Sequence, residues 1–443
     1  MRHLVLIYVL ILLLLNPSPS VARQTSNDEV LPEEFSTRAI AHIVNLAGLG
    51  HRQVSTKNDR HAVQYIKDQF EDMDIAVEIQ PFAFESFEYT TLDLQVRNSH
   101  FDVQGLGLNP YKNRFRDRRE YEGTAFLIDL NDPVIRCTQE QIEGKTVISN
   151  NWNGHFRLLP FQPELVIYVD SSTFAELESQ HEIPYTLRIQ GKYKMYESAN
   201  IIGIVGNTNP SSKEILITAH FDTYRKNNPG ASDNASGVAV MLELARYFKK
   251  NESKLNCVVK FVGFGAEEVG VVGSRNYLHR NVESLRHCGL LFNIDDVGGN
   301  GPILVEKAGG VTGTPETKCE SQIPEYIQAC SWEGVNSRWR MLADDDLMKI
   351  ITASNHPPWL VDVVNQSVAE LGYSIRATGT QGSDQIAFAQ AGIVTSGVGI
   401  ISQHSHTSKD VPENINTQSL RIAAEIAASV VLNTANRFKA RNQ

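Results

Sequence analysis

The second half of the sequence carries histidine and carboxylate residues at positions that could support chemistry. In chain order they are His220 with Asp222, Asp233, Glu267 with Glu268, Asp295 with Asp296, and His406. Imidazole and carboxylate groups without thiolates suit a divalent ion, zinc first, and indicate a catalytic site rather than a closed structural one. Five ligands exceed what one open zinc site uses, but two ions about 3.5–4 Å apart that share one carboxylate would each have three. These residue types therefore predict a two-zinc centre, where coordination lowers the pKa of a water to about 7.

The segments around these residues alternate between short apolar runs and amphipathic helical patterns. Apolar runs of strand length occupy 215–219, 258–264, 290–294 and 393–401, and helical periodicity begins near 234 and 274 and covers 359–371 and 420–430. Continuous apolar strands between helices indicate a parallel sheet that is covered on both faces. We therefore expect an α/β fold, a three-layer sandwich with a mostly parallel central sheet.

The candidate ligands follow the expected strands closely. Asp233 instead opens a helix, and His406 comes a few residues after the last strand. The C-terminal edge of an open parallel sheet is where loops converge and ligands bind, so separate segments can build one site there. Successive side chains diverge, so one of Glu267 and Glu268 can bind metal while the other acts as a free base. Asp222 is placed to accept a hydrogen bond from the second ring nitrogen of a metal-bound His220.

A different pattern covers residues 85–195. Residues 91–96 alternate as a half-exposed strand does, and 146–148 and 165–169 are short β-type runs with few helices between them. We interpret this stretch as a β-rich inserted domain, with residues 23–84 and 196–443 forming the catalytic domain. Helical patterns at 38–49 and 61–73 then belong to the catalytic domain. A basic cluster at 112–119 is interleaved with acids, which is typical of a solvated face.

The N-terminal segment has the features of a secretory signal. An apolar run at 4–15 follows Arg2 and His3, and Pro17 and Pro19 precede small residues that end at Ala22. A spanning helix needs about 20 apolar residues, so a membrane anchor fits less well than a cleaved signal. We expect residues 1–22 to be a signal peptide and the protein to be secreted or periplasmic, in either case extracytoplasmic, without stable membrane insertion after cleavage.

Composition sets further bounds. The chain has 443 residues, 42% of them hydrophobic and 21% charged, which is typical of a globular protein of two or three domains. Its formal net charge of −10 disfavours nucleic acid as a partner. The five cysteines are an odd number and match no zinc motif. Cys257 and Cys288 precede apolar runs and are expected in the core, Cys319 and Cys330 could close a surface loop, and the pairing stays open.

Several motifs resemble those of a known family. They are His220-Phe-Asp222, Gly230-Ala-Ser-Asp233-Asn234-Ala-Ser-Gly237, Phe264-Gly-Ala-Glu267-Glu268-Val-Gly, Asn293-Ile-Asp295, Ser383-Asp384 with Phe388-Ala-Gln-Ala-Gly392, and His406-Thr. In this order they are similar to the motifs of co-catalytic di-zinc exopeptidases, the group that contains bacterial leucyl aminopeptidases and glutamate carboxypeptidase II. The resemblance covers about residues 196–440.

The resemblance implies a role for each position. One zinc would be held by His220 and Asp295, and the other by Glu268 and His406, with Asp233 bridging them. Glu267 matches the general base, and Asp222 matches the residue that orients the histidine ligand. Residues 143–148 are similar to part of a protease-associated domain. Ser405 replaces the tyrosine that precedes the last ligand in the carboxypeptidase branch, so the group that stabilises the oxyanion is unassigned, with Tyr373 and His404 as candidates.

Each residue also has a purely structural interpretation. Asp233 could cap a helix, Glu267 and Glu268 could be first-turn residues, and His220 could be an interior histidine. Asp296 is expected to be a surface acid or a partner of a ligand. The joint pattern favours the site, because five strand-end positions would otherwise have acquired ligand-type residues independently.

The expected function is a secreted zinc exopeptidase, most simply an aminopeptidase acting on peptide or protein N-termini. Three alternatives stay open: a glutaminyl cyclase, which is a one-zinc transferase on a similar fold, a carboxypeptidase for acidic C-terminal residues, and a non-catalytic ectodomain such as the transferrin receptor. The cyclase fits less well because both His220 and the 233–237 helix start are present. The ectodomain fits least, because every ligand and the base are retained.

Overall fold

A computed structural model describes residues 31–108, 120–206, 212–310, 354–379 and 382–441, with short gaps at 133, 136, 152–157, 159–160, 162, 179–181 and 225. The expected signal peptide at 1–22, the basic cluster at 112–119, Cys319 and Cys330 lie outside the described residues.

Within the described residues the strands form one 13-stranded sheet. The strands are β1 (Ala76–Val96), β2 (Ser99–Asp102), β3 (Gly105–Leu108), β4 (Glu120–Ile128), β5 (Thr146–Ser149), β6 (Leu165–Tyr168), β7 (Glu182–Val205), β8 (Glu214–His220), β9 (Val258–Phe264), β10 (Cys288–Ile294), β11 (Leu304–Glu306), β12 (Arg376–Thr378) and β13 (Thr395–Gly399). At its centre, neighbouring strands β13, β10, β8 and β9 are parallel. Antiparallel pairs flank this centre, β11 with β13 on one side and β7 with β9 on the other. The sheet is therefore mixed, and its parallel part is the part whose strands precede the candidate ligands.

The helices connect these strands. They are α2 (Phe35–Gly48), α3 (Lys57–Glu71), α4 (Gln139–Ile142), α5 (Ser171–Leu177), α6 (Gly237–Lys250), α7 (Val272–Arg280), α8 (Val282–Leu285), α11 (Pro358–Leu371), α12 (Gln385–Gln390) and α13 (Thr417–Arg441). Local signals explain several ends: the Thr56 hydroxyl accepts the Asp59 N–H at the start of α3, and Gly372, with φ of 70°, ends α11. The strand expected at 258–264 has those bounds, and the helices expected at 38–49 and 61–73 begin three to four residues earlier.

Side chains from the parallel strands pack on both faces of the sheet. Ile215 and Ile217 of β8 belong to one apolar core that includes residues of α2, α3, α6, α11 and α13. Leu216, between them, belongs to another core with residues of α7 and α12. A strand that is buried on both faces must be apolar at every position, which is why these strands read as continuous apolar runs.

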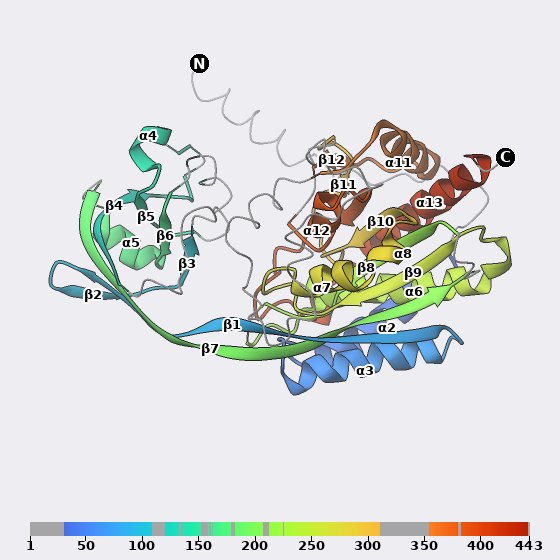
Figure 1. Ribbon diagram of the computed structural model, residues 1–443, viewed down its shortest axis with the longest axis horizontal. Coiled ribbons are helices and arrows are strands. Elements are labelled where there is room, and N and C mark those ends of the chain that lie inside the picture. Colours follow the sequence, from blue (N-terminus) through green and yellow to red (C-terminus); the bar gives the residue numbers. More distant parts are fainter. Residues whose placement is uncertain are drawn as a thin grey trace, which may run out of the picture.

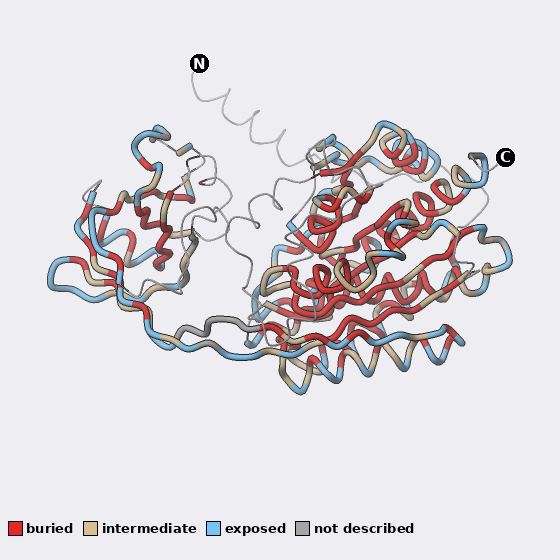
Figure 2. The backbone as a smooth tube through the Cα atoms, in the orientation of Figure 1, coloured by how far each residue is buried: buried red, intermediate tan, exposed pale blue. Residues whose placement is uncertain are grey.

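Two long antiparallel strands extend away from the group of elements that contains the parallel strands. β1 and β7 stay paired from Ala76 opposite Ile204 to Gln95 opposite Thr186, and Figure 1 shows them curving away to a second, smaller group of elements. Figure 2 shows buried backbone concentrated in the two groups and exposed backbone along much of the ribbon between them. The expected domain boundaries at 84/85 and 195/196 fall inside these strands and stay a prediction.

The smaller group has its own apolar core. Parallel strands β4, β5 and β6 extend the sheet beyond β7, and Ile148, Leu165 and Leu187 are among the fully buried residues there. Helices α4 and α5 accompany these strands. The smaller group is therefore a mixed unit with more strands than helices.

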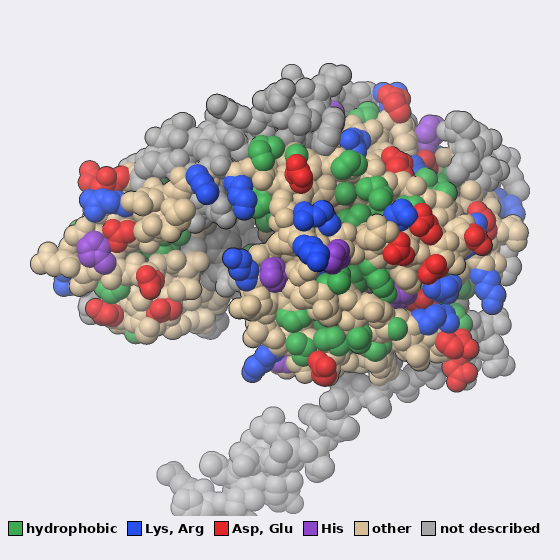
Figure 3. All heavy atoms as spheres, turned by 90° about the horizontal axis from the view of Figure 1, so that it is seen from below, with side chains coloured by type: hydrophobic (Ala, Val, Ile, Leu, Met, Phe, Trp, Pro, Cys, Tyr) green, Lys and Arg blue, Asp and Glu red, His purple; other side chains and the backbone are tan. Residues whose placement is uncertain are grey.

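The mixed α/β class that the sequence predicts is confirmed. Cys257 and Cys288 are buried, as expected. Among the described residues, none of the helices combines the length and the apolar character that a membrane crossing requires. On the face in Figure 3, acidic and basic side chains are interspersed around hydrophobic ones.

Candidate metal centre

Three neighbouring parallel strands deliver most of the candidate ligands. His220 is the last residue of β8, and Asp295 comes directly after β10. Glu267 and Glu268 lie in the turn that follows β9. Because β8 lies between β10 and β9 in the sheet, carboxylates from both neighbouring strand ends flank the histidine. The expectation that these positions converge at one sheet edge is met.

Asp233 reaches the same edge from the turn before α6, a π-helical segment over Ala231–Ser236. Asp233 does not cap this helical segment, because Gly230 occupies the N-cap position. Gly230 has a φ of 62°, and a Cβ there would lie 2.4 Å from a methyl of Thr223 and 2.6 Å from the Asp233 carbonyl oxygen. Only glycine therefore fits at the start of the turn that presents Asp233.

His406 comes from the loop after β13, and Asp296 holds that loop. The Asp296 carboxylate accepts hydrogen bonds from the Ser402 N–H at 3.2 Å and from the Ser405 hydroxyl at 2.6 Å. It also accepts one from the Ser232 hydroxyl, next to Asp233. Asp296 is only 5% exposed, so of its two expected interpretations the surface one is wrong. This carboxylate ties the Asp233 turn to the His406 loop.

The donor atoms meet around Asp233. His220 Nε2 lies 3.2 Å from Asp233 Oδ1 and 3.2 Å from Asp295 Oδ1. His406 Nε2 lies 2.9 Å from Asp233 Oδ2 and 3.4 Å from Glu268 Oε2. The two oxygens of Asp233 thus face different histidines. Two sets of three donors result, each with ligand atoms within 4.8 Å of one another, and Asp233 belongs to both.

Asp222 organises the turn that carries the two glutamates. Its Oδ1 accepts the Glu267 N–H at 3.0 Å, and its Oδ2 accepts the Glu268 N–H at 3.1 Å. The same Oδ1 lies 3.5 Å from His220 Nδ1, on the ring edge opposite the other carboxylates. Asp222 therefore orients both the histidine and the glutamate turn. A ligand atom of Glu267 also lies within 4.8 Å of ligand atoms of His220 and Glu268, so Glu267 borders the same space.

The electrostatics of this cluster call for a cation. Burial opposes protonation of His220, but the carboxylates of Asp295 and Glu267 outweigh burial and hold its pKa well above the usual range. Burial has the same opposing effect on His406, yet hydrogen bonds to Asp233 and Glu268 raise its pKa to about 11. Burial raises the pKa of Glu267 well above its ordinary value. Without another cation, protons on these groups must neutralise the carboxylates.

The residues present fit zinc. Imidazole nitrogens and carboxylate oxygens without thiolates are the donors of catalytic zinc sites. Glu268 Oε1 is a buried oxygen that has no hydrogen-bond partner within the described part of the chain. Burial raises the pKa of Glu268 to about 7, which shows how poorly the site accommodates its charge alone. A divalent ion would supply both the missing partner and the missing charge.

Two supporting residues were missed from the sequence. Arg52, fully buried, donates from Nε to the Phe221 carbonyl at 2.8 Å and from Nη2 to the Gly230 carbonyl at 2.9 Å. Asp410 accepts the Ser232 N–H at 2.7 Å and the Asp233 N–H at 3.1 Å. Arg52 thereby joins the His220 strand end to the Asp233 turn. Neither residue lies in a metal-ligand motif, and nothing in the local sequence distinguishes them from other charged residues.

The candidates for oxyanion stabilisation lie elsewhere or stay unassigned. The Tyr373 hydroxyl donates to Glu425 of α13, and its role stays a prediction. His404 is partly exposed, and its ring lies next to the Gln403 side chain. Instead, Tyr224 stacks on the ring of His406 with 4.5 Å between ring centroids. Tyr224 lies four residues after His220, and this spacing matches no motif that would have predicted the contact.

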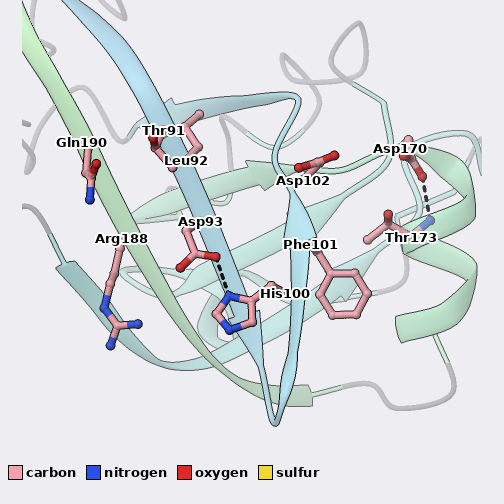
Figure 4. Close-up of a pocket in the computed structure, with 10 residues that line it drawn as sticks. All are labelled: Thr91, Leu92, Asp93, His100, Phe101, Asp102, Asp170, Thr173, Arg188 and Gln190. Atoms are coloured by element: carbon pink, nitrogen blue, oxygen red, sulfur yellow. Dashed lines mark hydrogen bonds and ion pairs between the residues drawn. The ribbon is translucent and has the colours of Figure 1, made fainter.

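A pocket in the smaller unit offers a contrast. Figure 4 shows this pocket, of about 490 Å³, between β1, β2, β7 and the start of α5. Three of its ionisable groups have local partners: His100 Nδ1 lies 2.7 Å from Asp93 Oδ1, and Asp170 accepts the Thr173 N–H at 2.7 Å to cap α5. Among the described residues, the candidate metal-binding groups all lie at the sheet edge where His220, Asp295 and Glu268 converge, and none lies in this pocket.

Known proteins share this sequence pattern and fold. Residues 200–332 match the family described as peptidase family M28. Aminopeptidase YwaD of Bacillus subtilis is 28% identical in a 317-residue alignment that covers 64% of this chain and 68% of that protein. A probable zinc metalloprotease of Pyrenophora tritici-repentis is 32% identical over 105 residues, 22% of this chain and 24% of that protein. The solved aminopeptidase of Aneurinibacillus sp. strain AM-1 has a similar fold, with a TM-score of 0.58 and 20% identity over 89% of this chain and 93% of its own.

The donor set at the sheet edge and the zinc protease relatives define the class, a zinc metallopeptidase. The chain is similar to peptidase family M28 over residues 200–332 and has aminopeptidases among its homologues. The predicted family of zinc exopeptidases and the predicted hydrolase class are thereby confirmed.

Proposed function

We propose that this chain is a secreted two-zinc aminopeptidase that removes residues from the N-termini of peptides. The observation that carries the proposal is the position of Asp233, whose two oxygens face His220 and His406 and so belong to two donor sets. A bridging carboxylate of this kind suits a pair of ions. A one-zinc transferase would not require two complete sets.

His220 and Asp295 would hold one ion, Glu268 and His406 the other, and Asp233 both. When bound, zinc lowers the pKa of a water at the site to about 7 and polarises the scissile carbonyl. The oxygens of Asp222 keep the His220 ring and the glutamate turn in place for this arrangement.

Glu267 is the proposed general base. It accepts a proton from the attacking water and passes that proton to the nitrogen of the departing amine. A bond forms between the carbonyl carbon and the water oxygen, the C–N bond breaks, and the products are an amino acid and a peptide shortened by one residue. Burial raises the pKa of Glu267, which brings its proton affinity closer to what a base at neutral pH requires.

Acidic groups around the site suit a substrate ammonium. The side chain of Asp295 is 26% exposed, and Glu267, which belongs to another donor group around His220, is partly exposed. The Asp295 carboxylate can face a free amino terminus, which an N-blocked peptide lacks. This favours the aminopeptidase over the carboxypeptidase.

The leader at 1–22 supports export as part of the proposal. Expression of the full chain in a secreting host, followed by N-terminal sequencing, should show a mature protein that begins after Ala22. Retention of the leader in a membrane fraction would contradict it.

The central experiment combines metal analysis with substrate choice. We expect about two zinc ions per chain, loss of activity after chelation, and hydrolysis of aminoacyl p-nitroanilides but not of their N-acetyl forms. One zinc per chain with cyclisation of N-terminal glutamine would contradict the proposal in favour of the cyclase. Cleavage restricted to N-blocked acidic dipeptides would favour the carboxypeptidase.

A further inference from the structure

A second pocket lies directly beside the candidate metal centre. It has a volume of about 480 Å³ and is lined by residues of the α2–α3 loop, of β1 and β7, and of the segments after His220 and Glu268. This size is within the range of small-molecule sites. Asp222 forms part of its wall, and so does Tyr224, whose ring stacks on His406. A ligand in this pocket would therefore lie next to the residues of the candidate metal centre.

The floor of the pocket is apolar and tightly built. Val54, Phe84, Tyr196 and Val269 line it and also belong to one small hydrophobic cluster. The rings of Phe84 and Tyr196 stack with 5.7 Å between centroids. Such a floor favours an apolar or aromatic side chain, since burial of that side chain removes apolar surface from water.

The α2–α3 loop is fixed against the other walls. The Gln53 side chain donates to the Tyr224 carbonyl at 3.0 Å, and the Arg52 N–H donates to the Thr223 hydroxyl at 2.9 Å. The Ser55 hydroxyl accepts the Glu197 N–H at 2.6 Å. The pocket is thus preformed, which reduces the entropy cost of filling it.

The rim carries positive charge. Lys194 and Lys226 both line the pocket and are exposed, and the Lys194 ammonium lies 4.9 Å from the centre of the Tyr196 ring. Two ammonium groups repel the free amino end of a substrate and attract a carboxylate. Asp222 also lines the pocket, but it is buried and both of its oxygens accept backbone N–H groups, so the exposed charge of the lining is positive and assigns the pocket to the carboxyl side of the scissile bond.

The position of the base agrees with the charge. Glu267 passes its proton to the leaving nitrogen, so the leaving residue lies on the side of Glu267, and Val269 in the pocket wall is two residues further along the same turn. We propose that this pocket binds the leaving residue of a dipeptide, with an apolar side chain on the floor and the free α-carboxylate at Lys194 and Lys226. This inference rests on the proposed aminopeptidase function and names its substrate class, dipeptides with an apolar C-terminal residue.

The test compares leucyl-phenylalanine, its C-terminal amide and leucyl-glycine on the zinc-loaded full chain. We expect kcat/KM for leucyl-phenylalanine to exceed that for each of the other two about tenfold, since charge-assisted hydrogen bonds and apolar burial are each worth a factor of this order. In the double variant Lys194→Ala, Lys226→Ala the preference for the free carboxylate should fall to about twofold or less, mainly through KM.

Lys192→Ala is the matched control, because Lys192 is exposed on the same strand and does not line the pocket. It should keep the tenfold preference. Equal kcat/KM for the dipeptide and its amide in the unmodified protein, or an unchanged preference in the double variant, would overturn the pocket assignment. Failure to cleave any substrate with a free amino terminus would instead overturn the proposed function, so the two failures are distinguishable.

Discussion

Two of the pockets to which strand β7 contributes have almost equal volumes, about 490 and 480 Å³, and only the second of these two adjoins the candidate metal centre. Arg188 and Gln190 line the pocket in the smaller unit, while Lys194 and Tyr196 line the one beside the candidate metal centre. A few residues along one strand separate the two. Volume and the presence of acids therefore do not distinguish a functional pocket here.

What differs is the burial and pairing of the charged groups. In the smaller unit, Asp93 has His100 as a partner. Arg188 lies 3.0 Å from Glu120, and about half of each of these two side chains is exposed. At the catalytic edge, Asp233 and Glu268 are less than 10% exposed, and histidines are their ion-pair partners. Buried carboxylates in excess of cations are costly, and a metal ion compensates for that cost. Four predictions test this contrast, from the largest expected effect to the smallest.

The largest effect is expected for Glu267→Gln. Loss of the base should lower kcat by about 10²–10⁴-fold, the range typical of general acid–base catalysis. Zinc content should not change, because Glu267 is not assigned to either ion. Glu283→Gln, at an exposed acid on α8, is the control and should keep full activity. Full activity in the Glu267 variant would refute its role.

Removal of the Arg52 guanidinium should lower both stability and zinc affinity, although Arg52 is not a candidate ligand. Arg52→Met leaves buried carbonyls of Phe221 and Gly230 without their donor, and the unfolding free energy should fall by roughly 2–6 kcal/mol, at about 1–3 kcal/mol for each of the two groups. Zinc affinity should weaken as well, since both contacts adjoin ligand segments. Chemical denaturation and zinc titration measure the two effects. Arg60→Met, at an exposed arginine on α3, should change neither, and equal behaviour of the two variants would contradict the positioning role.

Asp59 provides a pH test of burial away from the ligands. Burial raises its pKa to about 7, and Ser198 and Ser55 donate to its oxygens. Because the folded pKa is above the unfolded one, the buried charge costs nothing below about pH 4, and its cost grows until about pH 7. Asp59→Asn should therefore gain roughly 1–3 kcal/mol of unfolding free energy relative to the unmodified protein between pH 4 and pH 8.

The measurement for Asp59 is denaturant unfolding at several pH values. Asp72→Asn, at the exposed end of the same helix, should show no such trend. A difference between Asp59→Asn and the unmodified protein that does not change with pH would contradict the effect of burial.

The smallest effect is expected in the smaller unit. His100→Ala removes a pair that is 57% exposed at the histidine, so unfolding free energy should change by less than about 1 kcal/mol. Activity on aminoacyl substrates should stay within about twofold. A loss of activity comparable to that of Glu267→Gln would show that the pocket in Figure 4 is functional and would break the comparison.

Much of the centre was predictable because local signals pointed to it. Apolar runs end at His220 and before Asp295, and parallel strands bring their C-terminal ends to one edge, so their convergence followed from periodicity and a general rule. The antiparallel strands that flank the parallel centre were not predictable, because strand direction depends on the connections between strands. The extent of β1 and β7 across both units was hidden for the same reason, since their pairing joins residues about 90 to 130 positions apart.

The residues that support the ligands show where sequence reasoning ends. Residue types and spacing alone predicted a pool of candidate donors, the choice of zinc and the α/β class, because the chemistry of a side chain and the periodicity of its segment are local properties. The resemblance of the motifs to a known family then assigned the ligands and chose Glu267 as the candidate base. Only the tertiary structure decided that Arg52 and Asp410 hold the Asp233 turn, that Asp296 joins two loops, and that lysines from β7 and from the segment after His220 share one pocket. Those contacts join segments far apart in the chain, and no local pattern encodes which distant partner a buried or rim charge will meet.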